Sequence, residues 1–206
     1  MELDTYKERG TNQGLLAEPI NLLSNIAFFA ATLLTMPFCR SWVDGILSTG
    51  ISIVGIASSL YHARPCRMTL LGDTLSIVVW TIFYVFVWAH FMMGFQPLVT
   101  AGVMITFFTL NILFDWKFGK AMNGSADYIP VIILLLFCGS CVWYKSGHPH
   151  LVIAGILAAG ALVFRVVDRD VHLPTGTHFI WHILNGFMMA LLTLFVSIYV
   201  MVEGAT

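Results

Sequence analysis

The chain contains few charged residues for its length. Asp, Glu, Lys and Arg make up 10% of its 206 residues, whereas about a quarter of a soluble domain is charged. Its ten Lys and Arg residues nowhere form a run, which argues against the basic surface that nucleic acid requires. Hydrophobic residues instead account for 58% of the chain, and the mean hydropathy is +0.85. The composition therefore predicts an integral membrane protein that binds no nucleic acid.

Cysteine is also scarce, with four residues in the whole chain. Cys138 and Cys141 form a C-x-x-C pair inside an apolar run, without the second pair or the βαβ context of a zinc or redox site. We interpret all four cysteines as packing residues. The first seventeen residues contain five charged side chains and no long apolar stretch, so we expect no cleavable signal peptide.

Apolar runs occupy most of the remaining sequence. A helix needs about 20 mainly apolar residues to cross a bilayer. Because the links between the runs are short, consecutive helices should be antiparallel neighbours. We predict an all-α membrane protein, a seven-transmembrane helix bundle formed by one domain that spans residues 1–206. The predicted helices cover residues 18–38, 45–61, 70–91, 97–114, 128–144, 150–167 and 178–202.

Lys and Arg are unevenly distributed between the loops that seven helices would create. The opposite side of the membrane from the N-terminus holds only Arg40 and Lys145. Since cytoplasmic loops are enriched in Lys and Arg, we predict a multi-pass protein with a cytoplasmic N-terminus and an external C-terminus. The N-terminal side holds Lys7, Arg9, Arg64, Arg67, Lys117, Lys120, Arg165 and Arg169.

Several polar residues interrupt the apolar runs at one level of the predicted bundle. Ser58 and His62 are four residues apart, as are His178 and His182, so each pair shares one helix face. The topology brings both pairs and Asp73 to the cytoplasmic side. Three imidazoles could bind zinc and leave a fourth position for water, which is the arrangement of a catalytic site. The sequence therefore predicts a zinc site formed by His62, His178 and His182 near the cytoplasmic side.

Asp73 and Ser58 are the candidate catalytic residues beside this site. Zinc lowers the pKa of a bound water to about 7, and a nearby carboxylate such as Asp73 could act as the general base. The Ser58 hydroxyl, one turn deeper than His62, could orient the water or stabilise an oxyanion. Taken singly, these residues fit helix packing or interior hydrogen bonding. Their common depth favours hydrolysis of an amide or ester over a proton-coupled transporter, which needs polar groups across the membrane. Haem held by two histidines is a further alternative.

Two further polar patterns have more than one interpretation. Glu18, Asn21 and Asn25 form a polar stripe on the first helix, suited to interhelical hydrogen bonds, to support of the metal ligands or to an oxygen-rich calcium site. Asp168 and Asp170 flank Arg169, and we interpret them as an exposed charge cluster rather than a cation site.

Four segments together resemble the alkaline ceramidase family. They are AEPINLLSN at residues 17–25, SSLYHA at 58–63, Gly72-Asp73, and GTHFIWHILNG at 176–186. The resemblance covers nearly the whole chain and extends to the CREST superfamily of seven-transmembrane hydrolases, which also contains the progestin and adipoQ receptors. The compact loops are similar to those of bacterial members, which implies location in a bacterial inner membrane.

The resemblance implies a zinc-dependent enzyme that cleaves the amide bond of ceramide or a related acyl-amide lipid taken from the bilayer. The products would be a fatty acid and a sphingoid base. His62, His178 and His182 would hold the zinc, with Asp73 and Ser58 completing the site. The alternative is a lipid-sensing receptor of the progestin/adipoQ type with a mainly structural zinc.

Eukaryotic ceramidases also bind calcium beside the zinc through an acidic N-terminal motif. Here Asp4, Glu18 and Asn21 could contribute oxygen atoms to a calcium ion. Lys7 and Arg9 would oppose a divalent cation at the same place, which argues against calcium in this chain.

Overall fold

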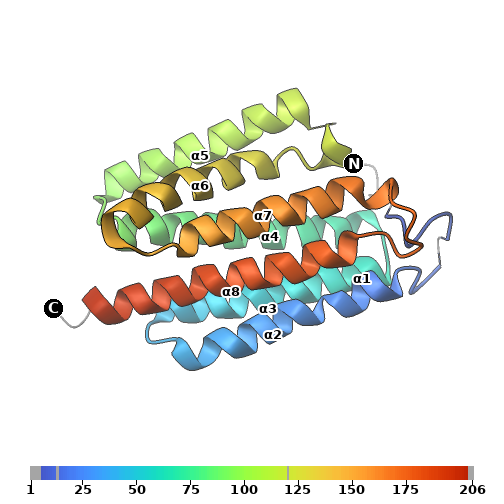
Figure 1. The fold of residues 1–206 in the computed structure, drawn as a ribbon, viewed down its shortest axis with the longest axis horizontal. Helices are drawn as coiled ribbons and strands as arrows, with labels where there is room; N and C mark the ends of the chain where they lie inside the picture. Colours follow the sequence, from blue (N-terminus) through green and yellow to red (C-terminus); the bar gives the residue numbers. More distant parts are fainter. Residues whose placement is uncertain (1–5, 13, 120, 204–206) are drawn as a thin grey trace.

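The computed structural model describes residues 6–12, 14–119 and 121–203 as an antiparallel bundle of α-helices (Figure 1). No strand occurs among these residues. The first predicted helix is divided in two, so that α1 and α2 together form one arm and α3 to α8 form six more. The helices are α1 (Pro19–Ser24), α2 (Ile26–Thr35), α3 (Trp42–Ala63), α4 (Arg67–Val87), α5 (Pro97–Phe118), α6 (Tyr128–Ser146), α7 (His150–Val166) and α8 (His178–Glu203).

Six segments of this bundle are long and apolar enough to cross a membrane. They comprise α1 and α2 taken together and the arms that contain α3, α4, α5, α7 and α8. The predicted segment at Tyr128–Tyr144, within α6, is apolar but shorter than these six. The chain is therefore a multi-pass membrane protein, and the described helices supply six long spans where the sequence predicted seven.

The break in the first arm occurs at Asn25. Its side-chain amide donates to the carbonyl of Asn21, and its backbone N–H donates to Leu22 O at 3.3 Å instead of to the carbonyl four residues back. Side chains that hydrogen-bond to nearby carbonyls compete with regular helix formation, which explains why an apolar run predicted as one helix is interrupted. The interruption separates α1, which buries Asn21 and Ser24, from α2.

Helix α3 begins at Trp42, earlier than the predicted residue 45. Ser41 and Asp44 form a capping box, in which the Ser41 Oγ accepts from the Asp44 N–H and the Asp44 carboxylate accepts from the Ser41 N–H. Because this cap satisfies N–H groups at the helix start, the helix extends to the link after α2. At its other end α3 continues through His62 to Ala63, so His62 has a fixed helical orientation.

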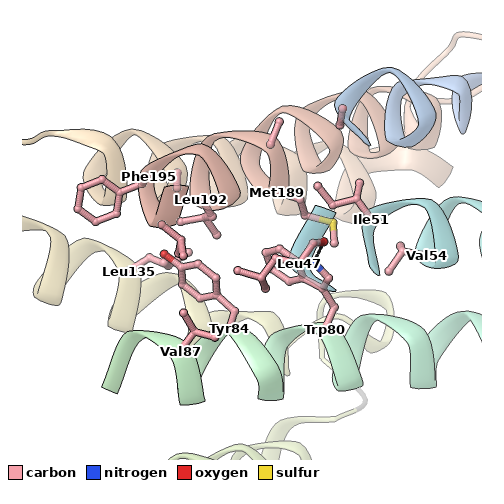
Figure 2. Close-up of a cluster of buried hydrophobic side chains, with 14 of the residues drawn as sticks. Leu47, Ile51, Val54, Trp80, Tyr84, Val87, Leu135, Met189, Leu192 and Phe195 are labelled. Carbon is pink, nitrogen blue, oxygen red and sulfur yellow. Dashed lines mark hydrogen bonds between the residues drawn. The ribbon is translucent and has the colours of Figure 1, made fainter. Parts of the chain in front are cut away.

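Figure 2 shows the hydrophobic core between α3, α4, α6 and α8. Leu47, Trp80, Leu135 and Leu192 are buried members of this cluster, one from each of the four helices. The Trp80 indole donates to Leu47 O at 3.0 Å, and its ring stacks on Tyr84. This packing joins α3 to α4 and holds both against α8, which starts at the same end of the bundle as α4 (Figure 1).

Candidate metal centre

Three buried histidines from two helices meet at one end of the bundle. His62 lies in the last turn of α3, His178 is the first residue of α8, and His182 follows one turn later. One ring nitrogen from each lies within 4.8 Å of the others. All three side chains are at most 1% exposed. Since imidazole nitrogen is a common ligand for transition metals, the cluster could hold a metal ion.

The spacing of the ring nitrogens fits a shared ion. His62 Nε2 lies 3.2 Å from His182 Nε2. Two nitrogens that bind one zinc at 2.0–2.1 Å with tetrahedral geometry are about 3.3 Å apart. The Ser58 hydroxyl lies 3.4 Å from the same His182 nitrogen, so the structure brings this predicted residue to the edge of the cluster.

Glu18 orients His62. Its Oε2 lies 2.5 Å from His62 Nδ1, and it also accepts from the Asn21 amide at 3.1 Å. A carboxylate accepts hydrogen bonds only, so the proton of the neutral ring is on Nδ1 and the lone pair is on Nε2, which faces His182. Arg9 forms an ion pair with the other carboxylate oxygen of Glu18 and is itself buried. Of the three interpretations of this polar stripe, these contacts match interhelical hydrogen bonding that supports a candidate metal ligand.

Ser24 orients His182, and sequence reasoning missed this residue. Its hydroxyl donates to Asn21 O at 2.7 Å and lies 2.6 Å from His182 Nδ1. Because the hydroxyl proton is engaged by the carbonyl, the hydroxyl accepts from Nδ1–H, which again leaves Nε2 free to bind an ion. The signal was present in the sequence, since Ser24 is three residues after Asn21 and extends its polar stripe.

Asp168 holds the start of α8, contrary to the expectation that it is an exposed charge. It is 1% exposed, whereas its neighbour Asp170 is exposed. Its Oδ1 accepts from the N–H groups of Thr177 and His178 at 2.6 and 2.8 Å, and its Oδ2 accepts from the Lys7 N–H at 2.8 Å. The loop before α8 brings the carboxylate to unsatisfied N–H groups at a helix N-terminus, where negative charge is stabilised.

Aromatic rings enclose His178. The Tyr6 ring stacks on its imidazole with centroids 3.8 Å apart, and Trp181 stacks on it at 5.2 Å. Arg165 donates to the Tyr6 hydroxyl at 2.9 Å and lies over the Trp181 ring. The Nδ1 of His178 has no hydrogen-bond partner among the described residues, so stacking and the fixed backbone orient this ring.

Asp73 is buried in the second turn of α4, at the end of the bundle where α3 ends and α8 begins (Figure 1). Its carboxylate does not belong to the group of ligand atoms within 4.8 Å of one another. Asn21 is buried against Glu18, as described above. Asp4 lies outside the described residues. The structure thus places Ser58, Glu18 and Asn21 at the histidine cluster. The catalytic role of Asp73 stays a prediction.

Glu8 joins the N-terminal segment to the same region. Its two carboxylate oxygens accept from the N–H groups of Ile20 and Asn21 at 2.7 and 2.8 Å, which caps the start of α1. Burial raises the pKa of Glu8, and the two backbone hydrogen bonds act in the opposite direction. The charged N-terminal segment is therefore packed against the cluster.

No protein-family model, curated protein or solved structure matches this chain. The class of this protein is therefore defined by its helical fold and its histidine cluster. The chain is a multi-helix, apolar membrane protein with a buried three-histidine cluster that could hold a metal ion.

Proposed function

We propose that this protein is a zinc-dependent intramembrane hydrolase that cleaves the amide bond of ceramide or a related acyl-amide lipid. The observation that carries the proposal is the His62–His178–His182 cluster, in which Glu18 and Ser24 hold two imidazoles with Nε2 available to one ion. The resemblance of the surrounding segments to alkaline ceramidases supplies the substrate class.

The donor set fits zinc. Three neutral imidazoles with their second nitrogens hydrogen-bonded or stacked are a common zinc environment, and three protein ligands are typical of catalytic rather than structural sites. Zinc bound here would polarise the substrate carbonyl and acidify water.

The protein side chains would then perform amide hydrolysis in two proton transfers. Asp73 accepts a proton from the attacking water as its oxygen bonds to the carbonyl carbon. The Ser58 hydroxyl, 3.4 Å from His182 Nε2, donates a hydrogen bond to the developing oxyanion. Asp73 returns the proton to the nitrogen as the C–N bond breaks, which releases an amine and a fatty acid.

A cavity beside the cluster supports a lipid substrate. It has a volume of about 340 Å³ and lies among α4, α5, α6, α7 and α8. Trp181, which stacks on His178, lines the cavity together with Ile77, Phe108 and Ile132. Helix α5 forms one wall and buries only Thr100 among its described residues, so a hydrocarbon chain could enter beside it from the bilayer.

The orientation is also a proposal. The cluster lies at the end of the bundle where α1 and α8 begin (Figure 1), and the Lys and Arg bias would make that end cytoplasmic. The protein would then act at the inner leaflet of a bacterial inner membrane, with its C-terminus outside. A calcium ion at Glu18 would have to displace the Arg9 guanidinium.

Fatty-acid release from a panel of ceramides and other acyl amides tests the proposal directly. The purified protein would be assayed beside His178→Ala and Asp73→Ala, with zinc content determined for every sample. We expect both variants to lose activity and only the histidine variant to lose zinc. A zinc-loaded wild-type protein that releases no fatty acid from any substrate would refute hydrolysis.

The second candidate is a lipid-sensing receptor of the progestin/adipoQ type with a structural zinc. The observation that favours it is the close cover of His178 by Tyr6 and Trp181. A receptor should show no turnover even as the wild-type protein. Its Asp73→Ala variant should bind zinc and lipid as the wild type does.

A further inference from the structure

The N-terminal segment contacts the histidine cluster and the residues that support it at four points. We call residues 6–9 the N-terminal clasp. The Tyr6 ring stacks on His178, the Lys7 N–H donates to Asp168, the Glu8 carboxylate caps α1, and Arg9 pairs with Glu18. Tyr6 and Arg9 are 6% and 4% exposed, although the segment is highly charged. Such burial is typical of a packed structural element rather than of a chain terminus.

Each attachment point supports a different part of the metal centre. Glu18 holds the His62 ring, and Asp168 holds the backbone of His178. Helix α1, which Glu8 caps, carries Ser24, which holds His182. Displacing the clasp would therefore weaken the support of all three ligands at once and uncover one face of the His178 ring.

The Arg9–Glu18 pair gives the clasp a strong closed position. Both side chains are buried, and the Arg9 guanidinium also lies 5.5 Å from the centre of the Tyr61 ring. Separating a buried ion pair leaves two uncompensated charges, so the closed arrangement should dominate. Tyr6 adds a second contact, since Arg165 holds its hydroxyl while its ring covers His178.

We propose that the N-terminal clasp is a gate for the metal ion, which enters and leaves the three-histidine site only when residues 6–9 lift. The occupant is a divalent transition metal. The gate rests on the metal centre proposed above and does not depend on hydrolysis. A gate slows exchange in both directions, whereas a contact that merely positions a ligand changes mainly the rate of dissociation.

Metal exchange kinetics test the gate. Zn²⁺-loaded protein would be mixed with excess chromophoric chelator to follow release, and metal-free protein would be mixed with Zn²⁺ to follow uptake. Tyr6→Ala removes the cover while leaving both charges of the Arg9–Glu18 pair in place. We expect this variant to release and take up zinc about tenfold faster, a change on the order of those caused by loss of outer support in metal sites.

Lys7→Ala is the matched control within the same segment. The attachment of Lys7 to Asp168 uses its backbone N–H, and its amine makes only an exposed contact with Arg169 O. This variant should exchange zinc at the wild-type rates. Arg9→Met, like Tyr6→Ala, should release and take up zinc faster than the wild type.

Equal exchange rates for wild type and Tyr6→Ala would refute the gate, as would faster release without faster uptake. Both rates are independent of fatty-acid release, so an inactive protein could still have a gate, and an active protein could lack one. A protein that binds no zinc in any form would instead refute the metal centre itself.

Discussion

Single residues outside the three-histidine cluster determine how its ring nitrogens are oriented. Two imidazoles donate hydrogen bonds from Nδ1 to acceptors on the first arm of the bundle, and these bonds fix both the ring orientation and the tautomer. Ser24 performs this role through a hydroxyl and Glu18 through a carboxylate. Removing one should therefore weaken zinc binding by a different amount from removing the other. The third ligand, His178, depends on its backbone and on ring stacking.

Ser24→Ala should weaken zinc binding without abolishing it. The substitution leaves the buried His182 Nδ1 without its partner, and loss of such support typically lowers metal affinity by about 10–100-fold. Competition against a chelator of known affinity measures the effect. Ser140→Ala is the control, because Ser140 is an exposed serine whose hydroxyl contacts only Leu136 O. Unchanged zinc affinity in Ser24→Ala would contradict the assigned tautomer.

Asp168→Ala should destabilise the fold and weaken the zinc site together. The change removes an acceptor from three backbone N–H groups, including that of His178, and buried hydrogen bonds to a charged group contribute about 1–3 kcal/mol. Thermal unfolding in detergent with and without zinc measures both effects. Asp170→Ala, at an exposed neighbour, should change neither, and equal behaviour of the two variants would refute the role of Asp168.

At the scale of elements, the bundle contains tightly and loosely packed helix pairs. Helices α6 and α7 approach so closely that a Cβ at Gly139 would lie 2.7 Å from Val152 N. Helix α5 makes few buried contacts, and a Cβ at Gly102 would meet nothing within 4 Å. The cavity that Trp181 lines also borders this loosely packed helix.

Gly139→Ala should therefore lower stability by about 1–3 kcal/mol, because the backbone of α7 must move to relieve the contact. Gly102→Ala should be neutral or stabilising by up to about 1 kcal/mol, since it improves helix propensity at an open position. Urea-induced unfolding in mixed micelles compares the two. Equal stability would mean that α6 and α7 do not pack as described.

If the protein hydrolyses acyl-amide lipids as proposed, filling the cavity should affect long-chain substrates more than short-chain ones. Ile132 lines the cavity, whereas the adjacent Ile133 is exposed. Ile132→Trp should raise KM for long-chain acyl amides several-fold more than for short-chain ones, because the added ring occupies the space of the chain. Ile133→Trp should leave KM for both long-chain and short-chain acyl amides close to the wild-type values. An equal change in KM for long-chain and short-chain acyl amides would show that the acyl chain does not occupy this cavity.

At the scale of the whole molecule, the candidate metal centre joins the first arm of the bundle to α3 and α8. An ion that binds only the folded protein stabilises it by about 3 kcal/mol at a free concentration 100 times Kd, which corresponds to a Tm shift of about 5–10 °C. Chelation should lower the Tm of the wild type by this amount. His182→Ala should show no response to chelator, and a wild-type Tm that ignores chelation would contradict a bound ion.

Composition and apolar run length were enough to predict a multi-pass membrane protein and most of its helices. Bilayer thickness sets the length of an apolar run that crosses the membrane. The helices after α2 accordingly begin and end within a few residues of the predicted bounds. Helical geometry alone places His178 and His182 on one face. Because short links make consecutive helices antiparallel, His62 in the last turn of α3 lies at the same end of the bundle.

The groups that support these histidines depend instead on how distant segments of the chain pack together. Ser24 and His182 are 158 residues apart, and Lys7 and Asp168 are 161 apart. Such contacts depend on packing between elements and on loops without periodic patterns, so neither spacing nor hydropathy predicts them. For the same reason Asp168 was misread as an exposed charge, and the burial of Tyr6 and Arg9 became visible only when the N-terminal segment was placed against α1, α3 and α8.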